Sequence, residues 1–288
     1  MRKQREALLG IAIGRKESGK TYETLKMINQ TLVGNQRTGG KPRRVLILDV
    51  NNEFSNVKTD QNPDFAHIKA LRLKDVRRFT THPIIEARRV SVIKEGGGKM
   101  NLDEIQDALH HILENYQNGL LLIEDMTKFI SDSLPSDLIG SMATLRHISV
   151  DIVTHFQTLG KMANPKLWGN ANWIRMHKCD DTVQRHENKF GGNVTHLKIL
   201  EKMVNIEYAK GNIYFNAYLN KDKGKLQGNF NKPQFTKAVE SYLEDNYKIV
   251  TKEVNAINLH TGSKKHRDHQ SAVKSLINQY GIDYYGNK

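Results

Sequence analysis

Eight residues near the start of the chain have the types and spacing that bind the phosphates of a nucleotide. Residues 14–21 read G-x-x-x-x-G-K-T and lie between a short apolar run and a helix-like segment. Glycines allow the backbone to curl so that successive N–H groups face one anion, and the positive end of the next helix dipole points there too. Lys20 can then reach the β- and γ-phosphates, and the Thr21 hydroxyl can bind Mg²⁺. We expect a nucleoside triphosphate to be bound by Gly14, Arg15, Lys16, Glu17, Ser18, Gly19, Lys20 and Thr21.

A pair of adjacent carboxylates follows a later apolar run. Glu124 and Asp125 come directly after four aliphatic residues at positions 120–123. In enzymes that hydrolyse nucleotides, one carboxylate orders Mg²⁺, directly or through its water, and the other polarises the attacking water. Position suggests Glu124 at the metal and Asp125 as the base, whereas residue type suggests the reverse, so both assignments stay open. The alternative is a strand that ends in two solvated acids.

Two further strand ends carry polar side chains that could reach the same place. An expected strand at residues 150–157 ends in Gln157, which can hydrogen-bond the attacking water or the γ-phosphate. An expected strand at residues 45–49 ends in Asp49, and Glu53 follows closely. Ligands of open parallel sheets bind beyond the carboxyl ends of the strands. Gln157 could instead be an ordinary strand-end residue, and Asp49 could simply cap a turn.

Arginines could complete such a site on a neighbouring subunit. Arg146 ends an expected helix that opens at residues 135–136, just before the strand at residues 150–157. A guanidinium there could reach a neighbour's γ-phosphate. Compensation of the helix dipole explains Arg146 equally well. Arg175 and Arg185 are competing candidates for the same role.

The elements that must position these residues alternate between short apolar runs and amphipathic segments. This alternation predicts an α/β fold with a mainly parallel central sheet flanked by helices. Asn101 is the expected N-cap of one helix. Strands are expected at residues 7–13, 45–49, 88–93, 119–123, 150–157, 172–177 and 213–219, and helices at residues 21–32, 102–116, 135–147, 197–208, 235–243 and 271–280.

Composition limits the classes of protein that fit. The chain has 288 residues, 38% of them hydrophobic, which suits one large α/β domain with a small appendage. No apolar run approaches the ~20 residues of a membrane span, and we expect no signal peptide, no membrane partner and a cytoplasmic location. The single cysteine, Cys179, excludes an internal disulfide. A net charge of +13 indicates a polyanionic partner, with nucleic acid first, although a merely basic enzyme is the alternative.

The chain changes character near residue 220. We expect a P-loop ATPase motor domain at residues 1–220 and a small basic C-terminal extension at residues 221–288, which could contact DNA or a partner. Residues 260–269 hold three histidines, but without cysteines and a closed ligand set they do not predict a zinc site.

Two other classes of nucleotide-binding protein fit poorly. A GTPase needs Asn-Lys-x-Asp to bind guanine, and the nearest match, residues 220–223, has Lys223 where the aspartate should be. A small-molecule kinase would carry an arginine-rich lid, and the sequence shows none. Paired acids and a polar strand tip instead describe an ATPase that hydrolyses ATP and moves something.

Three segments of the chain resemble the FtsK–HerA superfamily of ring-forming DNA pumps. They are the phosphate loop, residues 49–54 and residues 120–157. In that family the second strand ends in Asp before a Gly/Asn-Glu-aromatic pattern, and a helix ends in Arg just before the strand that carries a sensor Gln. Asp49 matches the first feature, and Arg146 and Gln157 match the second. The Glu-Asp order of the acids and the degenerate Asn-Asn-Glu are departures from the family pattern.

The resemblance covers residues 7–220 and is greatest to viral genome-packaging ATPases. It implies a P-loop NTPase fold with an extra strand between the Walker A (phosphate-loop) strand and the Walker B (acidic) strand. It also implies ATP and Mg²⁺ as cofactors, and a homo-oligomeric ring, a pentamer or hexamer, that translocates double-stranded DNA. Glu124 and Asp125 would activate water, Arg146 would act from the next subunit and Gln157 would report hydrolysis. A capsid portal protein would be a further partner, in the host cytoplasm at the assembling capsid.

Two alternative functions fit the same sequence features. One is a conjugation, segregation or morphogenesis ATPase of the same superfamily. The other is a structural protein that binds DNA or the capsid and uses the nucleotide only as a switch.

Overall fold

The computed structural model describes residues 7–34, 40–55, 68–94, 96–126, 149–258, 260 and 262–285. Arg146 and the helix expected at residues 135–147 lie outside the described residues. Within the described ranges, no helix is both long enough and apolar enough to cross a membrane.

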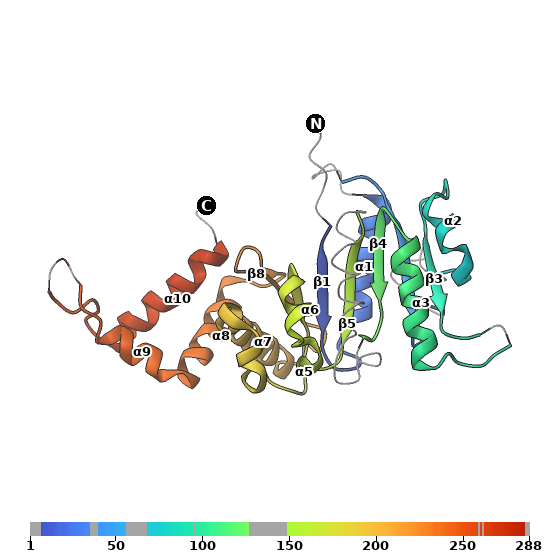
Figure 1. The fold of residues 1–288 in the computed structure, drawn as a ribbon. Coiled ribbons are helices and arrows are strands. Elements are labelled where there is room, and N and C mark those ends of the chain that lie inside the picture. Colours follow the sequence, from blue (N-terminus) through green and yellow to red (C-terminus); the bar gives the residue numbers. More distant parts are fainter. Residues whose placement is uncertain are drawn as a thin grey trace.

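An eight-stranded sheet forms the centre of the fold, in the order β3-β2-β4-β5-β1-β6-β7-β8 (Figure 1). The six strands from β3 to β6 in this order are parallel, and β7 pairs antiparallel with both of its neighbours. β5 lies between β1 and β4, so the prediction of an extra strand between the phosphate-loop strand and the acidic strand is confirmed. The strands are β1 (Leu9–Ile13), β2 (Arg44–Asp49), β3 (Ala87–Ser91), β4 (Gly119–Ile123), β5 (Asp151–Phe156), β6 (Trp173–Met176), β7 (Ala217–Asn220) and β8 (Lys225–Gly228).

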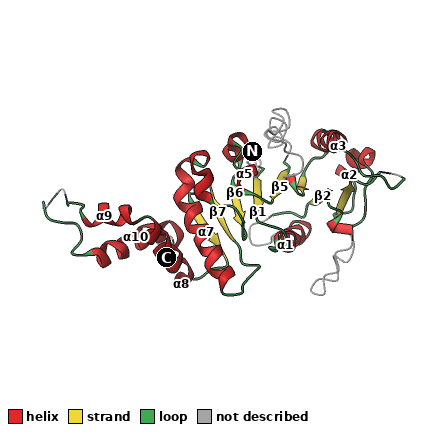
Figure 2. Cartoon of the chain, turned by 90° about the horizontal axis from the view of Figure 1, so that it is seen from below, coloured by secondary structure: helices red, strands yellow, loops and turns green. Residues whose placement is uncertain are grey.

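Helices cover both faces of this sheet, which is the arrangement of a P-loop NTPase. Figure 2 shows α1 on one face and α3 on the other. The predicted cap of α3 is confirmed, because Asn101 and Glu104 form a reciprocal capping box. The helices are α1 (Lys20–Val33), α2 (Val76–Thr80), α3 (Leu102–Asn115), α5 (Leu159–Met162), α6 (Pro165–Asn170), α7 (Val194–Ala209), α8 (Lys232–Asp245), α9 (Tyr247–Val254) and α10 (His269–Tyr285).

Successive side chains of a strand serve different cores, as the two-residue period of a strand requires. Ile47 of β2 belongs to the core that Leu25 and Ile28 of α1 complete. Its neighbour Leu48 belongs to the core on the other face, with Leu109 of α3. Strands buried on both faces read as continuous apolar runs, which is why β1, β2 and β4 were recognisable in the sequence.

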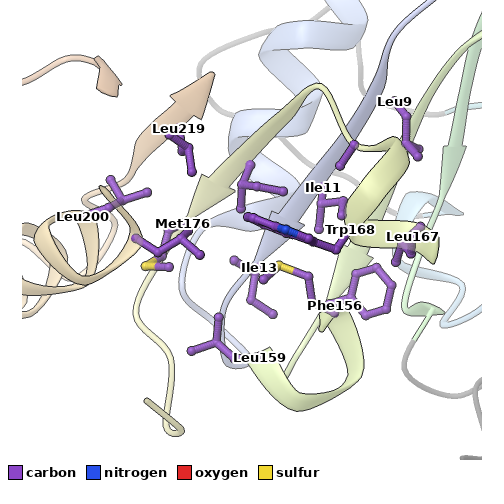
Figure 3. Packing of buried hydrophobic residues seen from close by; sticks show 14 of the residues in the cluster. Leu9, Ile11, Ile13, Phe156, Leu159, Leu167, Trp168, Met176, Leu200 and Leu219 are labelled. Carbon is purple, nitrogen blue, oxygen red and sulfur yellow. The ribbon is translucent and has the colours of Figure 1, made fainter. Parts of the chain in front are cut away.

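The strand that leads into the phosphate loop is held by packing from several helices (Figure 3). Ile11 and Ile13 of β1 are both fully buried in the larger core. Leu159 of α5, Trp168 of α6 and Leu200 of α7 belong to the same core. The end of β1, where the phosphate loop starts, is therefore fixed by a close-packed interior.

The segment before β7 departs from the sequence prediction. A strand is expected from residue 213, but β7 begins at Ala217. The Phe215 N–H donates to Asn212 O at 3.1 Å, so residues 212–215 form a turn instead. This turn lies beside the phosphate loop, close to Gly19.

The chain continues the sheet beyond residue 220. β8 pairs with β7, and the helices α8, α9 and α10 lie beyond this edge of the sheet (Figure 1). α9 was not expected from the sequence, and α10 runs through Gly281 to Tyr285 rather than ending at residue 280. The division of the chain at residue 220 stays a prediction.

Candidate active site

The phosphate loop joins β1 to α1 at the carboxyl edge of the parallel strands. The Gly14 N–H donates to Phe156 O of β5 at 3.2 Å. The Arg15 N–H donates to Lys178 O, just after β6, at 2.8 Å. A Cβ on Gly14 would lie 2.7 Å from a neighbouring side-chain oxygen, and Gly19 has φ = 86°, in the left-handed region that favours glycine. The two glycines of the motif are therefore required for different reasons. Gly14 has no space for a side chain, and Gly19 has a backbone conformation that favours glycine.

The motif lysine is turned back onto its own loop. Lys20 Nζ donates to Gly14 O at 2.6 Å and to Arg15 O at 2.7 Å. Burial lowers the pKa of Lys20 below its ordinary value, and nearby carboxylates oppose this effect. Phosphate oxygens would be stronger acceptors for this ammonium than peptide carbonyls are.

Both acids at the end of β4 are buried and bound to one asparagine. Glu124 and Asp125 are 4% and 3% exposed. Asn51 donates from Nδ2 to Glu124 Oε1 at 3.4 Å and to Asp125 Oδ2 at 3.2 Å. Its backbone N–H donates to Glu124 Oε2 at 3.3 Å. Burial, followed by the charges of Glu53 and Asp49, raises the pKa of Glu124 to about 8.

The end of β5 brings Gln157 to the same acids. Gln157 Nε2 donates to Asp125 Oδ2 at 3.0 Å. β5 pairs with β4, so the two strand ends are neighbours in the sheet. Asp125 thus receives amide hydrogens from the neighbouring strand end and from the loop after β2. These contacts orient one oxygen of its carboxylate.

The loop after β2 brings a third carboxylate to the phosphate loop. Thr21 Oγ1 donates to Glu53 Oε2 at 3.0 Å. Asp49 is fully buried and accepts the N–H groups of Glu53 at 2.9 Å and Phe54 at 3.2 Å. Asp49 also forms an ion pair with Arg89 at 3.4 Å. Of the two interpretations of Asp49, the structure therefore favours the turn cap, and Glu53 is the residue that this turn presents.

A cavity of about 600 Å³ connects these groups. Of the predicted site residues, the structure places Lys16, Glu17, Gly19, Lys20, Thr21, Glu124, Asp125 and Gln157 in its wall. Arg15 points elsewhere, toward the Tyr208 hydroxyl and Asp180, and Ser18 is buried with its hydroxyl on Arg15 O. Gly14 joins the loop to β5 through its N–H, which donates to Phe156 O. Arg146 lies outside the described residues.

The two alternative arginines have different surroundings. Arg175 is fully buried, and its guanidinium donates to Lys20 O at 3.1 Å and to Thr24 Oγ1 at 2.5 Å. This arginine is therefore inaccessible to a neighbouring subunit and supports the first turn of α1 instead. Arg185 is exposed in a short helix, Val183–Lys189, away from the cavity wall.

Four residues of the cavity wall were not considered as site residues in the sequence, namely Asn51, His155, Phe156 and Tyr214. Asn51 is positioned by the register of two strands, in which Leu48 of β2 pairs with Ile123 of β4, and this register is not written in any local sequence pattern. His155 lies on the inner side of the wall, hydrogen-bonded to Thr24 Oγ1 at 2.8 Å. Tyr214 had no signal, because the sequence placed it inside a strand.

The oxygen atoms around Thr21 suit Mg²⁺ rather than a softer metal. In the described part of the chain, no three His, Cys, Asp or Glu side chains are grouped closely enough to hold a metal by themselves. Mg²⁺ typically uses one or two carboxylates, several waters and the phosphates of the substrate. A hydroxyl from Thr21 and a carboxylate from Glu124 or Glu53, facing one cavity, match this donor set.

No protein-family model and no curated protein sequence matches the chain. The genome packaging NTPase B204 from Sulfolobus turreted icosahedral virus 2, in complex with ATP-gammaS, is similar over 78% of this chain and 97% of its own. The sequence identity is 14% and the TM-score is 0.46. The N-terminal domain of zonular occludens toxin from Neisseria meningitidis is similar at 12% identity and a TM-score of 0.34, over 61% of this chain and 79% of its own. The Legionella pneumophila ATPase DotB is similar at 11% identity and a TM-score of 0.37, over 96% of this chain and 61% of its own. Identities of 11–14% with TM-scores below 0.5 leave the function to the chemistry of this chain's own residues.

Proposed function

We propose that this chain is a Mg²⁺-dependent ATPase that translocates double-stranded DNA, as a subunit of a homo-oligomeric ring that packages a viral genome. The observation that carries the hydrolytic part is the convergence of the phosphate loop, the two acids and Gln157 on one cavity. The motor part is supported by the net charge of +13 and by the sequence resemblance. Further partners in this proposal are a capsid portal protein and other copies of the chain.

Binding of ATP would exchange one set of acceptors on Lys20 for another. The ammonium leaves Gly14 O and Arg15 O and binds the β- and γ-phosphates. The loop N–H groups and the first turn of α1 bind the same phosphates. The partly desolvated state of Lys20 strengthens the new contacts, because charges attract more strongly where water is excluded.

Thr21 and Glu124 would hold Mg²⁺, which would supply positive charge to neutralise the phosphates. Glu124 must be ionised to do so, whereas burial raises its pKa to about 8, which favours the protonated carboxyl in the free protein. Metal binding should therefore release a proton. Glu53 accepts the Thr21 hydroxyl hydrogen, which would leave the lone pairs of this hydroxyl oxygen for the metal.

Asp125 and Gln157 would orient the attacking water. The oxygen of this water attacks the γ-phosphorus, the bond from phosphorus to the β–γ bridging oxygen breaks, and ADP leaves. Asp125 takes the proton of the water as general base. The hydrogen bond that Gln157 donates to Asp125 supports these two roles, because it holds the Gln157 amide beside the proposed base.

Two substitutions separate binding from hydrolysis. Lys20→Ala should abolish ATP binding, whereas Asp125→Asn should bind ATP but not hydrolyse it. Both are measured by calorimetry with ATP and by phosphate release. If Asp125→Asn and Glu124→Gln hydrolyse ATP normally, the proposed site is wrong. If they lose hydrolysis but still package or assemble normally, the nucleotide acts only as a switch.

The ring and its DNA need separate experiments. Duplex DNA should stimulate the ATPase of the wild-type chain, and this stimulation should fall steeply with added salt because the contacts are to phosphates. Hydrolysis that is unchanged by duplex DNA at low salt would contradict the DNA pump. A mutated phosphate loop, Lys20→Ala, is the matched control for contaminating ATPases.

Arg146 provides the test of sharing between subunits. Arg146→Ala should lower the ATPase rate by roughly 10³–10⁵-fold if its guanidinium completes a neighbour's site. Mixing Arg146→Ala subunits with Lys20→Ala subunits should restore activity, because some interfaces then combine an intact lysine with an intact arginine. No restoration in any mixing ratio would contradict the trans arrangement.

A further inference from the structure

Tyr214 lies against the phosphate loop with most of its side chain in solvent. The residue is 59% exposed, so its ring is accessible to a ligand. A Cβ placed on Gly19 would lie 3.2 Å from Tyr214 Cδ1 and 3.4 Å from Tyr214 Cβ. The tyrosine therefore touches the loop at its second glycine.

The sheet topology explains why this residue reaches the loop. β7 is antiparallel to β6, so the residues just before β7 lie at the carboxyl end of β6. β6 pairs with β1, whose carboxyl end carries the phosphate loop (Figure 2). The turn at residues 212–215 thus stands beside the loop on the side away from the acids.

The two sides of the loop suggest the direction of the nucleotide. Glu124, Asp125 and Gln157 follow β4 and β5, which lie on one side of β1. A γ-phosphate near these residues directs the sugar and base toward the other side, where β6 and β7 lie. Tyr214 lines the 600 Å³ cavity that holds the acids and also a second cavity of about 580 Å³ beside the loop. Ile213, 42% exposed, lines only the second cavity.

Other tyrosines near the loop have rings already occupied by cations. The Arg15 guanidinium lies 5.0 Å from the Tyr208 ring centroid, and Lys178 Nζ lies 5.7 Å from it. Lys26 Nζ lies 4.4 Å from the Tyr22 ring centroid. Among the tyrosines of the described cavity walls, Tyr214 is the most exposed.

We propose that Tyr214 is the platform on which the base of the nucleotide stacks, with Ile213 as an adjoining apolar contact. This inference rests on the proposed function, because it assumes that the loop binds a nucleoside triphosphate. Every base has a π-face, so stacking supplies affinity without choosing among bases. The ligand class is therefore a nucleoside triphosphate with any base, and removing the Tyr214 ring should not change the affinity for inorganic tripolyphosphate.

The test compares ATP, GTP and inorganic tripolyphosphate by titration calorimetry on the full chain. Tyr214→Ala should weaken ATP and GTP by about 5- to 100-fold, the range expected for removing an aromatic stacking partner. Tripolyphosphate affinity should change by less than about twofold, since ring removal costs only what the base contributed. Tyr214→Phe keeps the ring and should retain wild-type affinity for all three.

Each other outcome has a defined meaning. An equal loss for ATP and tripolyphosphate would overturn the inference, because Tyr214 would then only support the loop at Gly19. Unchanged ATP affinity in Tyr214→Ala would overturn it as well, and so would wild-type ATP affinity no higher than that for tripolyphosphate. If the wild-type chain binds neither ligand, the proposed function fails first and the inference falls with it.

Discussion

At one end of the cavity Glu124 and Asp125 are 4% and 3% exposed, whereas Tyr214 at the other end is 59% exposed. The acids are held by hydrogen bonds from Asn51 and Gln157, which come from strand ends on either side. Tyr214, which lies on a turn, packs against the loop at Gly19. The acid end is therefore set by the register of the sheet, and the tyrosine end by one local turn.

This difference predicts different consequences for catalysis. Interactions that strengthen only in the transition state change kcat, whereas contacts that are equal in the ground and transition states change KM. The oriented, buried groups at the acid end face the atoms where bonds change. The aromatic end would face a base that does not react.

The largest effect is expected at the acid end. Asp125→Asn should lower kcat by about 10²–10⁴-fold, the usual contribution of a general base, with little change in ATP affinity. Single-turnover phosphate release and calorimetry measure the two quantities on one sample. A variant with normal kcat would show that Asp125 does not act as the base. The expected difference between the two ends, an effect on kcat at one and on KM at the other, would then be lost.

A pH-dependent effect of intermediate size should also arise from the acid end. The pKa of Glu124 is raised from an ordinary value of 4.5 to about 8, so between these pH values the folded chain holds a proton that the unfolded chain has lost. The free energy of unfolding should therefore fall as pH rises from about 5 to 8, by the order of a few kcal/mol in the absence of metal and nucleotide. Denaturant titrations across this range measure the slope.

The matched variants for this slope are Glu124→Gln and Glu240→Gln. The first removes the titrating group and should flatten the dependence, whereas the second changes an exposed glutamate and should keep it. A Glu124→Gln chain with the full wild-type slope would mean that Glu124 is ionised in the free protein.

The acid end was largely predictable from the sequence, for local reasons. Apolar runs marked the strands, and the residues that follow each run had to lie at one edge of a parallel sheet. This reasoning predicted that Glu124, Asp125 and Gln157 lie together, and they line one cavity. Asn51 was missed because its role depends on the register between β2 and β4, which no local pattern encodes.

The tyrosine end was not predictable, because the local sequence pattern there indicated the wrong element. Alternating Tyr214, Asn216 and Tyr218 resemble a half-buried strand, but the hydrogen bond from Phe215 N–H to Asn212 O closes a turn first. Arg175 was misjudged on similar grounds. An arginine inside a strand is seldom fully buried, and its acceptors on α1, Lys20 O and Thr24 Oγ1, become visible only in three dimensions.

A smaller kinetic effect would sharpen the comparison. Tyr214→Ala should raise KM for ATP by about tenfold and leave kcat within about twofold of wild type, because stacking is equal in the ground and transition states. Steady-state rates with and without duplex DNA provide both constants. A fall in kcat comparable with that of Asp125→Asn would show that the two ends act as one unit.

The smallest expected effect tests whether the Tyr214 ring lies over the loop in solution. Gly19→Ala should destabilise the fold by about 1–2 kcal/mol, because alanine is strained at the φ of 86° found there. Its new Cβ would also press on the Tyr214 ring, 3.2 Å away. Adding Tyr214→Ala relieves this contact but not the backbone strain. The double variant should therefore be more stable than the sum of the single variants predicts, by about 0.5 kcal/mol or more.

The neighbouring Ile213→Ala is the control and should show no such coupling with Gly19→Ala. Strict additivity for the Tyr214 pair, measured by denaturant unfolding, would place the ring away from the loop and leave the acid end as the sole ordered half of the site.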